Sequence, residues 1–267
     1  MKKCFAIFIL VFSISTFSQE ILSSRYLILN EPVRVEAELL DFSAPVYSFT
    51  ISISYKQDQY EVDSGIYFEG NPQQLPEEVK KLAGWKNGYL FIFDGCGGGN
   101  AWCCDMEKVF AIRDNKLKNL GDVCLHFAKS EYKPGASLED GYFIDVNAAL
   151  ENISCHACSP DLKVILKEEN ESLLPVEELT WKANLKRFKK NMKIVRKWYY
   201  SEKRENLLEV GDGIYFIALA SKFCDKEKIY KKVQLYAREW FKEETYSNFL
   251  DVMNTVTSIK EIRKGEK

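Results

Sequence analysis

Cysteines are the residues of this chain whose type and spacing are best suited to chemistry. Cys155 and Cys158 enclose one histidine and one alanine in the order Cys-His-Ala-Cys. This two-residue gap is typical of redox disulfides, in which one thiol has a lowered pKa, and of zinc sites. A redox motif usually opens a helix, but Ser159-Pro160 follows directly here. We therefore favour a structural disulfide, with redox chemistry and metal binding as alternatives.

Three more cysteines lie in or beside a glycine-rich segment. Residues 93–104 read Phe-Asp-Gly-Cys-Gly-Gly-Gly-Asn-Ala-Trp-Cys-Cys, and Cys124 follows on the far side of a predicted hairpin. Glycine tolerates positive φ angles, so the run allows two cysteine-bearing segments to fold back on each other. Cys104 and Cys124 each lie ten residues from Asp114 in the hairpin turn. We expect them to face each other and to form a disulfide.

This use of cysteine indicates an oxidising compartment. Adjacent cysteines rarely bond to each other, so proximity favours Cys96 with Cys103 and Cys155 with Cys158. Cys224 then stays free on a predicted buried helix. A zinc ion would need further ligands from the glycine-rich segment or from His126, and only one cysteine pair shows clear ligand spacing. We expect no metal and no cofactor.

The first 18 residues have the pattern of a cleaved secretory signal. They begin Met-Lys-Lys, continue with an apolar run over residues 4–12, and end with Thr16 and Ser18 two positions apart. The run is too short to span a bilayer, which disfavours the alternative of a retained anchor. We predict cleavage after Ser18, a periplasmic or secreted bacterial protein, and no transmembrane segment in the mature chain.

A predicted helix near the C-terminal third carries a dense cluster of basic residues. Its apolar side chains recur every three or four residues from Trp181 to Tyr199, and between them stand eight cations. These are Lys182, Lys186, Arg187, Lys189, Lys190, Lys193, Arg196 and Lys197. Such a face can contact anionic lipid or an acidic macromolecule, and Lys186, Lys189 and Lys193 are the candidate binding residues. The alternative is that this face is only solvated, and that acids in residues 168–178 and 202–209 offset its positive charge.

The elements that would carry these residues fall into two groups. Strict alternation over Val33–Leu39 and Tyr47–Tyr55 predicts strands with one wet face, and the apolar run Tyr89–Phe93 predicts a central strand covered on both faces. After residue 172 the apolar period becomes helical, and Asp225 is well placed to cap a later helix. We predict an α+β protein. A mostly antiparallel β domain (sandwich or curled sheet) over residues 19–172 precedes a small helical bundle over residues 173–267.

The function that these patterns favour is binding rather than catalysis. The chain has only two histidines, His126 and His156, and neither a nucleophile elbow nor a His-Glu-x-x-His motif. We therefore expect an exported, non-catalytic envelope or secreted protein that binds another macromolecule other than nucleic acid. An exported thiol-disulfide oxidoreductase or thiol-dependent metal binder using Cys155 and Cys158 is the first alternative. A hydrolase without a recognised motif is the second.

Overall fold

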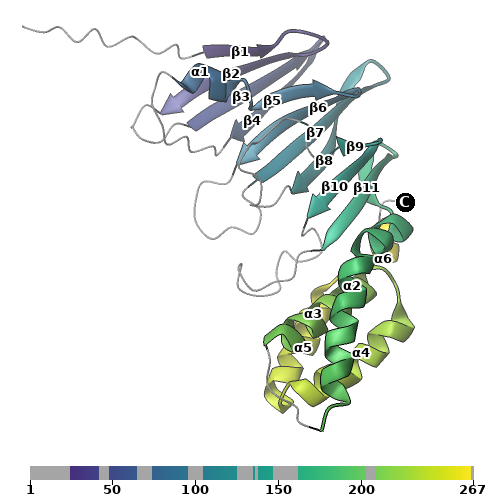
Figure 1. The fold of residues 1–267 in the computed structure, drawn as a ribbon. Coiled ribbons are helices and arrows are strands. Elements are labelled where there is room, and N and C mark those ends of the chain that lie inside the picture. The colour runs from purple at the N-terminus through teal and green to yellow at the C-terminus, as the bar shows by residue number, and fades with distance from the viewer. Residues whose placement is uncertain are drawn as a thin grey trace, which may run out of the picture.

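The structure is a computed structural model, and it describes residues 25–41, 48–64, 74–95, 105–124, 135, 138–146, 162–202 and 208–265. Three four-stranded antiparallel sheets follow one another along the chain, and a group of helices comes after them (Figure 1). Within each sheet the strands are neighbours in chain order. This arrangement confirms the predicted α+β fold with C-terminal helices.

The first sheet contains β1 (Arg25–Leu29), β2 (Arg34–Asp41), β3 (Ser48–Tyr55) and β4 (Asp58–Ser64). Alternate residues of β2 and β3, such as Val35 and Ile51, are fully buried, while residues between them face outward. The predicted strand with one wet face is therefore confirmed. The short helix α1 (Leu75–Val79) packs its two buried side chains, Leu75 and Val79, into the same core.

The second sheet contains β5 (Ala83–Lys86), β6 (Tyr89–Gly95), β7 (Asp105–Arg113) and β8 (Lys116–Cys124). It is buried on both faces. Leu90 and Ile92 belong to the core shared with the first sheet, whereas Phe91 between them belongs to a second core. The two-sided burial predicted for this strand is confirmed, because successive side chains of a strand point to opposite faces.

The third sheet contains β9 (Leu138–Glu139), β10 (Tyr142–Val146), β11 (Lys163–Glu169) and β12 (Ser172–Pro175). It packs on the other face of the second sheet, where the Phe143 ring lies 5.1 Å from the Tyr89 ring and 6.2 Å from the Phe91 ring. The predicted boundary between residues 172 and 173 lies inside the pairing of β11 with β12.

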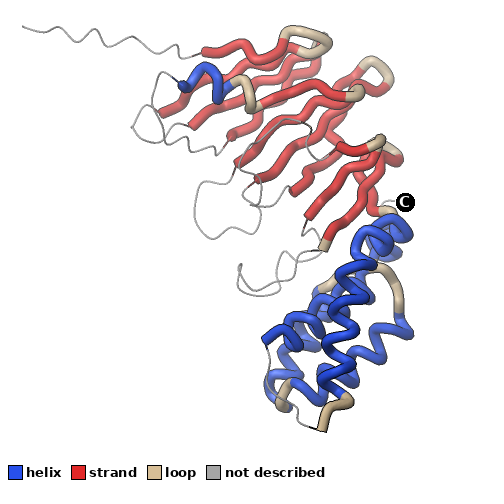
Figure 2. The backbone as a smooth tube through the Cα atoms, viewed as in Figure 1, coloured by secondary structure: helices blue, strands red, loops and turns tan. Residues whose placement is uncertain are grey.

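Two-residue turns join strands within all three sheets, at one end of the stack (Figure 2). In four of them both central residues have positive φ, namely Asn87-Gly88, Asp114-Asn115, Asp140-Gly141 and Asn170-Glu171. Turns with two positive φ angles match the right-handed twist of the strands that they join. Asn, Asp and Gly tolerate this conformation best. The turns fix the strand registers.

The register of β7 with β8 corrects one prediction. Cys124 faces Met106 and not Cys104, because the turn is centred between Asp114 and Asn115 and a bulge at Val109/Phe110 shifts the pairing further. The register argument for a Cys104–Cys124 disulfide therefore fails. Cys104 itself lies outside the described residues.

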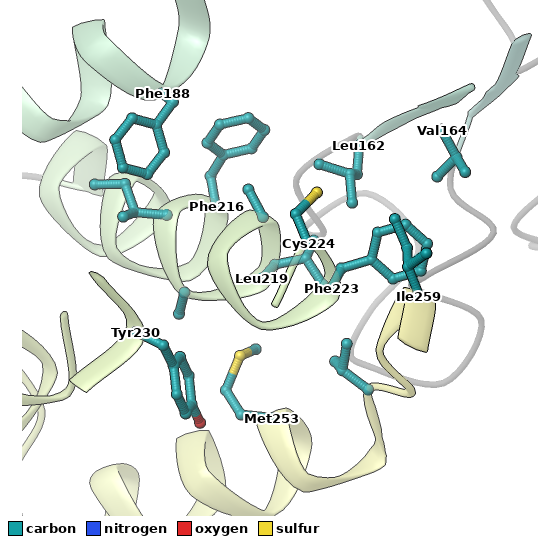
Figure 3. Close-up of a cluster of buried hydrophobic side chains, with 14 of the residues drawn as sticks. Leu162, Val164, Phe188, Phe216, Leu219, Phe223, Cys224, Tyr230, Met253 and Ile259 are labelled. Atoms are coloured by element: carbon teal, nitrogen blue, oxygen red, sulfur yellow. The ribbon is translucent and has the colours of Figure 1, made fainter. Parts of the chain in front are cut away.

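The helices are α2 (Glu177–Tyr199), α3 (Leu208–Phe223), α4 (Glu227–Trp240), α5 (Glu243–Thr255) and α6 (Ile259–Gly265). Helix α3 is the most buried of them, as its apolar sequence predicts. Its end, with Phe223 and Cys224, lies between Val164 of β11, Leu162 just before that strand, and Ile259 of α6 (Figure 3). One hydrophobic core is thus shared by the second sheet, the third sheet and the helices.

The predicted cap of α4 is wrong. Lys226 occupies the N-cap position, and Asp225 has a φ of 53° after the end of α3. The Asp225 carboxylate accepts a hydrogen bond of 3.2 Å from the backbone N–H of Lys260 instead. The side chain therefore holds the start of α6 rather than the start of α4.

Candidate binding surface on helix α2

Helix α2 is attached firmly to the third sheet. Beyond Pro175 the chain leaves β12 and continues alongside β11, where Val176 donates its backbone N–H to the carbonyl of Ile165 at 2.8 Å. The hydroxyl of Thr180 then accepts the N–H of Ile165 at 3.0 Å. The amide of Asn184 accepts the N–H of Lys163 at 3.1 Å and donates to its carbonyl at 2.7 Å.

These contacts satisfy the backbone of β11 where β12 no longer pairs with it. Thr180 is fully buried and Asn184 is 5% exposed, so both polar groups need such partners. Because they lie on one side of α2, the orientation of the helix about its own axis is fixed. The face of α2 that turns away from the protein is therefore a rigid surface.

That outward face is basic. Phe188, Met192 and Val195 continue the buried side of α2, and the exposed cations lie roughly opposite. We call seven of them the basic stripe: Lys182, Lys186, Lys189, Lys190, Lys193, Arg196 and Lys197. At 1.5 Å per residue the stripe extends about 22 Å along the helix. It includes all three residues that the sequence singled out.

Within the described part of the chain, no carboxylate forms an ion pair with the basic stripe. Four of the acids expected to offset it pair with other cations: Glu168 with Arg113, Glu169 with Arg263, Glu171 with Lys118 and Glu177 with Lys226. Residues 179–201 of the sequence contain no acid. The positive charge of the stripe is therefore not neutralised by these acids.

When no anion is bound, repulsion between neighbouring cations of the stripe destabilises α2. Lys182 and Lys186, Lys186 and Lys190, Lys189 and Lys193, and Lys193 and Lys197 are like-charged neighbours four residues apart. Each such pair destabilises a helix by about 0.2–0.5 kcal/mol. An anion bound along the stripe would remove this repulsion.

Arg187 is exposed like the other cations but differs from them in one contact. Its guanidinium lies 4.5 Å from the centre of the Phe216 ring on α3. Its cation–π contact therefore serves the packing of α2 against α3. The remaining seven cations constitute the candidate surface.

Two exposed side chains at the far end of the bundle were missed by the sequence reasoning. Tyr200 lies one turn beyond Arg196 and Lys197 and is 73% exposed, and Leu208 at the start of α3 is 87% exposed. Gly213 on α3 packs against Val195 and Asn191 of α2, and Phe216 further along α3 lies beside Arg187 earlier on α2, so the two helices are antiparallel neighbours. The spacing of Tyr200 from Lys193 and Arg196 was the available signal, since seven and four residues return to the same helix face.

The cysteine-centred candidates mostly lie outside the described residues. This applies to the side chains of Cys96, Cys103, Cys104, Cys124, Cys155 and Cys158 and to both histidines. Cys224 is free and fully buried, and burial raises the pKa of its thiol to about 12. A neutral, buried thiol is neither a nucleophile nor a metal ligand. Among the described residues, no three His, Cys, Asp or Glu side chains gather as a metal site.

Comparison of the chain with family models, curated proteins and solved structures finds no match in any of the three. Within the described ranges, no helix combines the length and the apolar character needed to cross a membrane. The geometry of α2 is therefore the basis for the functional proposal.

Proposed function

We propose that this protein is an exported interaction protein that binds an acidic macromolecule through the basic stripe of α2. The observation that carries the proposal is that seven exposed cations share one face of α2, while four acids close to them in sequence pair with other cations. Basic surfaces of this kind attract acidic partners over a distance and accelerate association.

The position of the stripe supports binding more than a general role in solubility. Solvated protein surfaces usually mix both signs of charge, because unbroken single-sign fields repel themselves. Here the hydrogen bonds of Thr180 and Asn184 to β11 hold the single-sign face outward. The leader-like residues 1–18 and the seven remaining cysteines support export to an oxidising compartment.

The proposal is tested by measuring how residues 19–267 bind fluorescent polyglutamate, a soluble acidic polymer. We expect binding that weakens as salt rises, because salt screens exposed charges. Replacing Lys186, Lys189 and Lys193 together by glutamine is expected to weaken binding at least tenfold, at roughly one power of ten for each 1.4 kcal/mol lost.

The matched control replaces Lys228, Lys231 and Lys232 of α4 by glutamine. These lysines are also exposed on the helical bundle, so the net charge changes equally. Similar weakening in both triple variants would show that only overall charge matters and would contradict a specific surface on α2. Failure of the unaltered protein to bind polyglutamate would contradict a soluble acidic partner for the basic stripe.

A further inference from the structure

We infer that the acidic partner of the basic stripe is the surface of an anionic lipid bilayer, with Tyr200 and Leu208 entering the headgroup region. This inference rests on the proposed function and names its partner. It is carried by the composition of the stripe, by the exposed side chains at its end and by the distribution of charge in the whole chain.

The composition of the stripe suits a broad surface of mobile anions. Six of its seven members are lysines, and they follow one line for about 22 Å along α2. Arginine binds a carboxylate with a rigid fork of donors, whereas lysine acts as a hydrated point charge. A line of point charges needs no fixed geometry in its partner. Lipid headgroups, which diffuse laterally, can adjust to it.

The end of the stripe supplies apolar contacts that a soluble acidic chain does not require. Tyr200 follows Arg196 and Lys197 on the same face, and Leu208 begins α3, whose opposite end packs against the third sheet. Their exposed fractions of 73% and 87% are among the highest of the large hydrophobic side chains described. Aromatic rings and leucines next to lysines are typical of helices at a membrane interface.

The charge of the chain is also segregated. Without Lys2 and Lys3 of the predicted leader, residues 19–267 have 35 basic and 39 acidic residues and a formal charge of −4; residues 182–197 contribute +8, so the remainder carries −12. A protein with this net charge distributed evenly would be repelled by an anionic bilayer. With the positive charge collected on α2, the attraction acts on one face and the acidic remainder is oriented away from the lipid.

The test is flotation of residues 19–267 with vesicles of phosphatidylcholine alone and of an equimolar mixture with phosphatidylglycerol. We expect binding to the mixed vesicles only, and loss of binding at high salt. Each lysine near an anionic surface contributes enough that glutamine at Lys186, Lys189 and Lys193 should lower the partition coefficient on the order of a hundredfold. The variant with glutamine at Lys228, Lys231 and Lys232 should change it much less.

A second variant distinguishes insertion of the Tyr200 and Leu208 side chains into the bilayer from electrostatic attraction by the basic stripe. Replacing Tyr200 and Leu208 by serine leaves every cation in place, and both side chains are exposed, so folding should be unaffected. We expect weaker partitioning into mixed vesicles together with unchanged polyglutamate binding. Serine at Leu235, which is 59% exposed on α4, is the control and should have no effect.

The outcomes distinguish this inference from the proposed function. Binding to polyglutamate without binding to mixed vesicles would overturn the lipid inference and leave the proposed function standing. Failure to bind either would overturn both. Equal partitioning of the Tyr200→Ser, Leu208→Ser variant and the unaltered protein would overturn the insertion of the bundle tip.

Discussion

At the scale of single residues, the thiol of Cys224 shows how position determines chemistry. It lies directly after α3, fully buried among Leu162, Phe223 and Ile259 (Figure 3). Burial is the main cause that raises its pKa to about 12, because a thiolate loses its hydration in an apolar core. At neutral pH the group is therefore a small hydrophobic side chain.

Counting thiols in residues 19–267 by mass after alkylation tests both this assignment and the predicted disulfides. We expect no reaction at Cys224 in the folded, unreduced protein and one reactive thiol, at Cys224, after unfolding without reductant. Reduction before alkylation should raise the count to seven. Seven reactive thiols without reductant would contradict an oxidised, exported protein.

At the scale of elements, one ionic cluster joins the second and third sheets. Arg113 at the end of β7 donates two hydrogen bonds to the carboxylate of Glu168 on β11, one of them 2.7 Å long from Nε. The hydroxyl of Tyr89 on β6 donates to the same carboxylate at 2.7 Å. Burial raises the pKa of the Glu168 carboxyl, but the hydrogen bonds from Arg113 and Tyr89 outweigh it and hold the pKa below its usual value.

Replacing Glu168 by glutamine should lower the free energy of unfolding by about 1–2 kcal/mol at neutral pH. A carboxyl with a lowered pKa in the folded state stabilises the protein above its unfolded pKa, and this contribution is lost as pH falls through the folded value. The difference between Glu168→Gln and the unaltered protein should therefore be smaller at an acidic pH below the usual range of a glutamate carboxyl than at neutral pH. Urea unfolding at both pH values measures it.

Glutamine at Glu178, an exposed acid in the first turn of α2, is the control for this variant and should have little effect. An equal loss of stability for Glu168→Gln at neutral and acidic pH would show that the carboxylate charge does not contribute. The cluster would then serve only through packing.

At the scale of the whole molecule, the third sheet and the helical bundle share one core. Phe143 and Val164 of the sheet belong to the same buried cluster as Phe223 of α3 and Met253 of α5. The side chains of Thr180 and Asn184 add hydrogen bonds between α2 and β11. The two groups of elements are therefore expected to be stable only together.

Hydrogen exchange in increasing denaturant tests this expectation. We expect backbone amides of β10, β11, α2 and α3 to lose protection at the same denaturant concentration, because opening one group exposes the apolar face of the other. A bundle that loses protection while β10 and β11 remain protected would contradict a shared core and would favour two independent domains.

Much of this architecture could be predicted from local patterns. Alternation of apolar and polar residues identified β3, and a continuous apolar run identified β6. Apolar side chains that recur every three or four residues identified α2. Short elements such as β9, with two residues, have too few positions to show a period. The cap of α4 was misassigned because Asp225 suits an N-cap by type, whereas its backbone lies in the left-handed region and its carboxylate binds α6.

The basic face of α2 was determined by the sequence, because helical periodicity alone separates its cations from its apolar side chains. The tertiary structure decided which acids are close enough to form ion pairs with that face. Glu168, Glu169, Glu171 and Glu177 are near the stripe in sequence but pair with Arg113, Arg263, Lys118 and Lys226 from distant parts of the chain. The physical reason is that charge pairing depends on distance in space, which only the packing of the sheets and helices fixes.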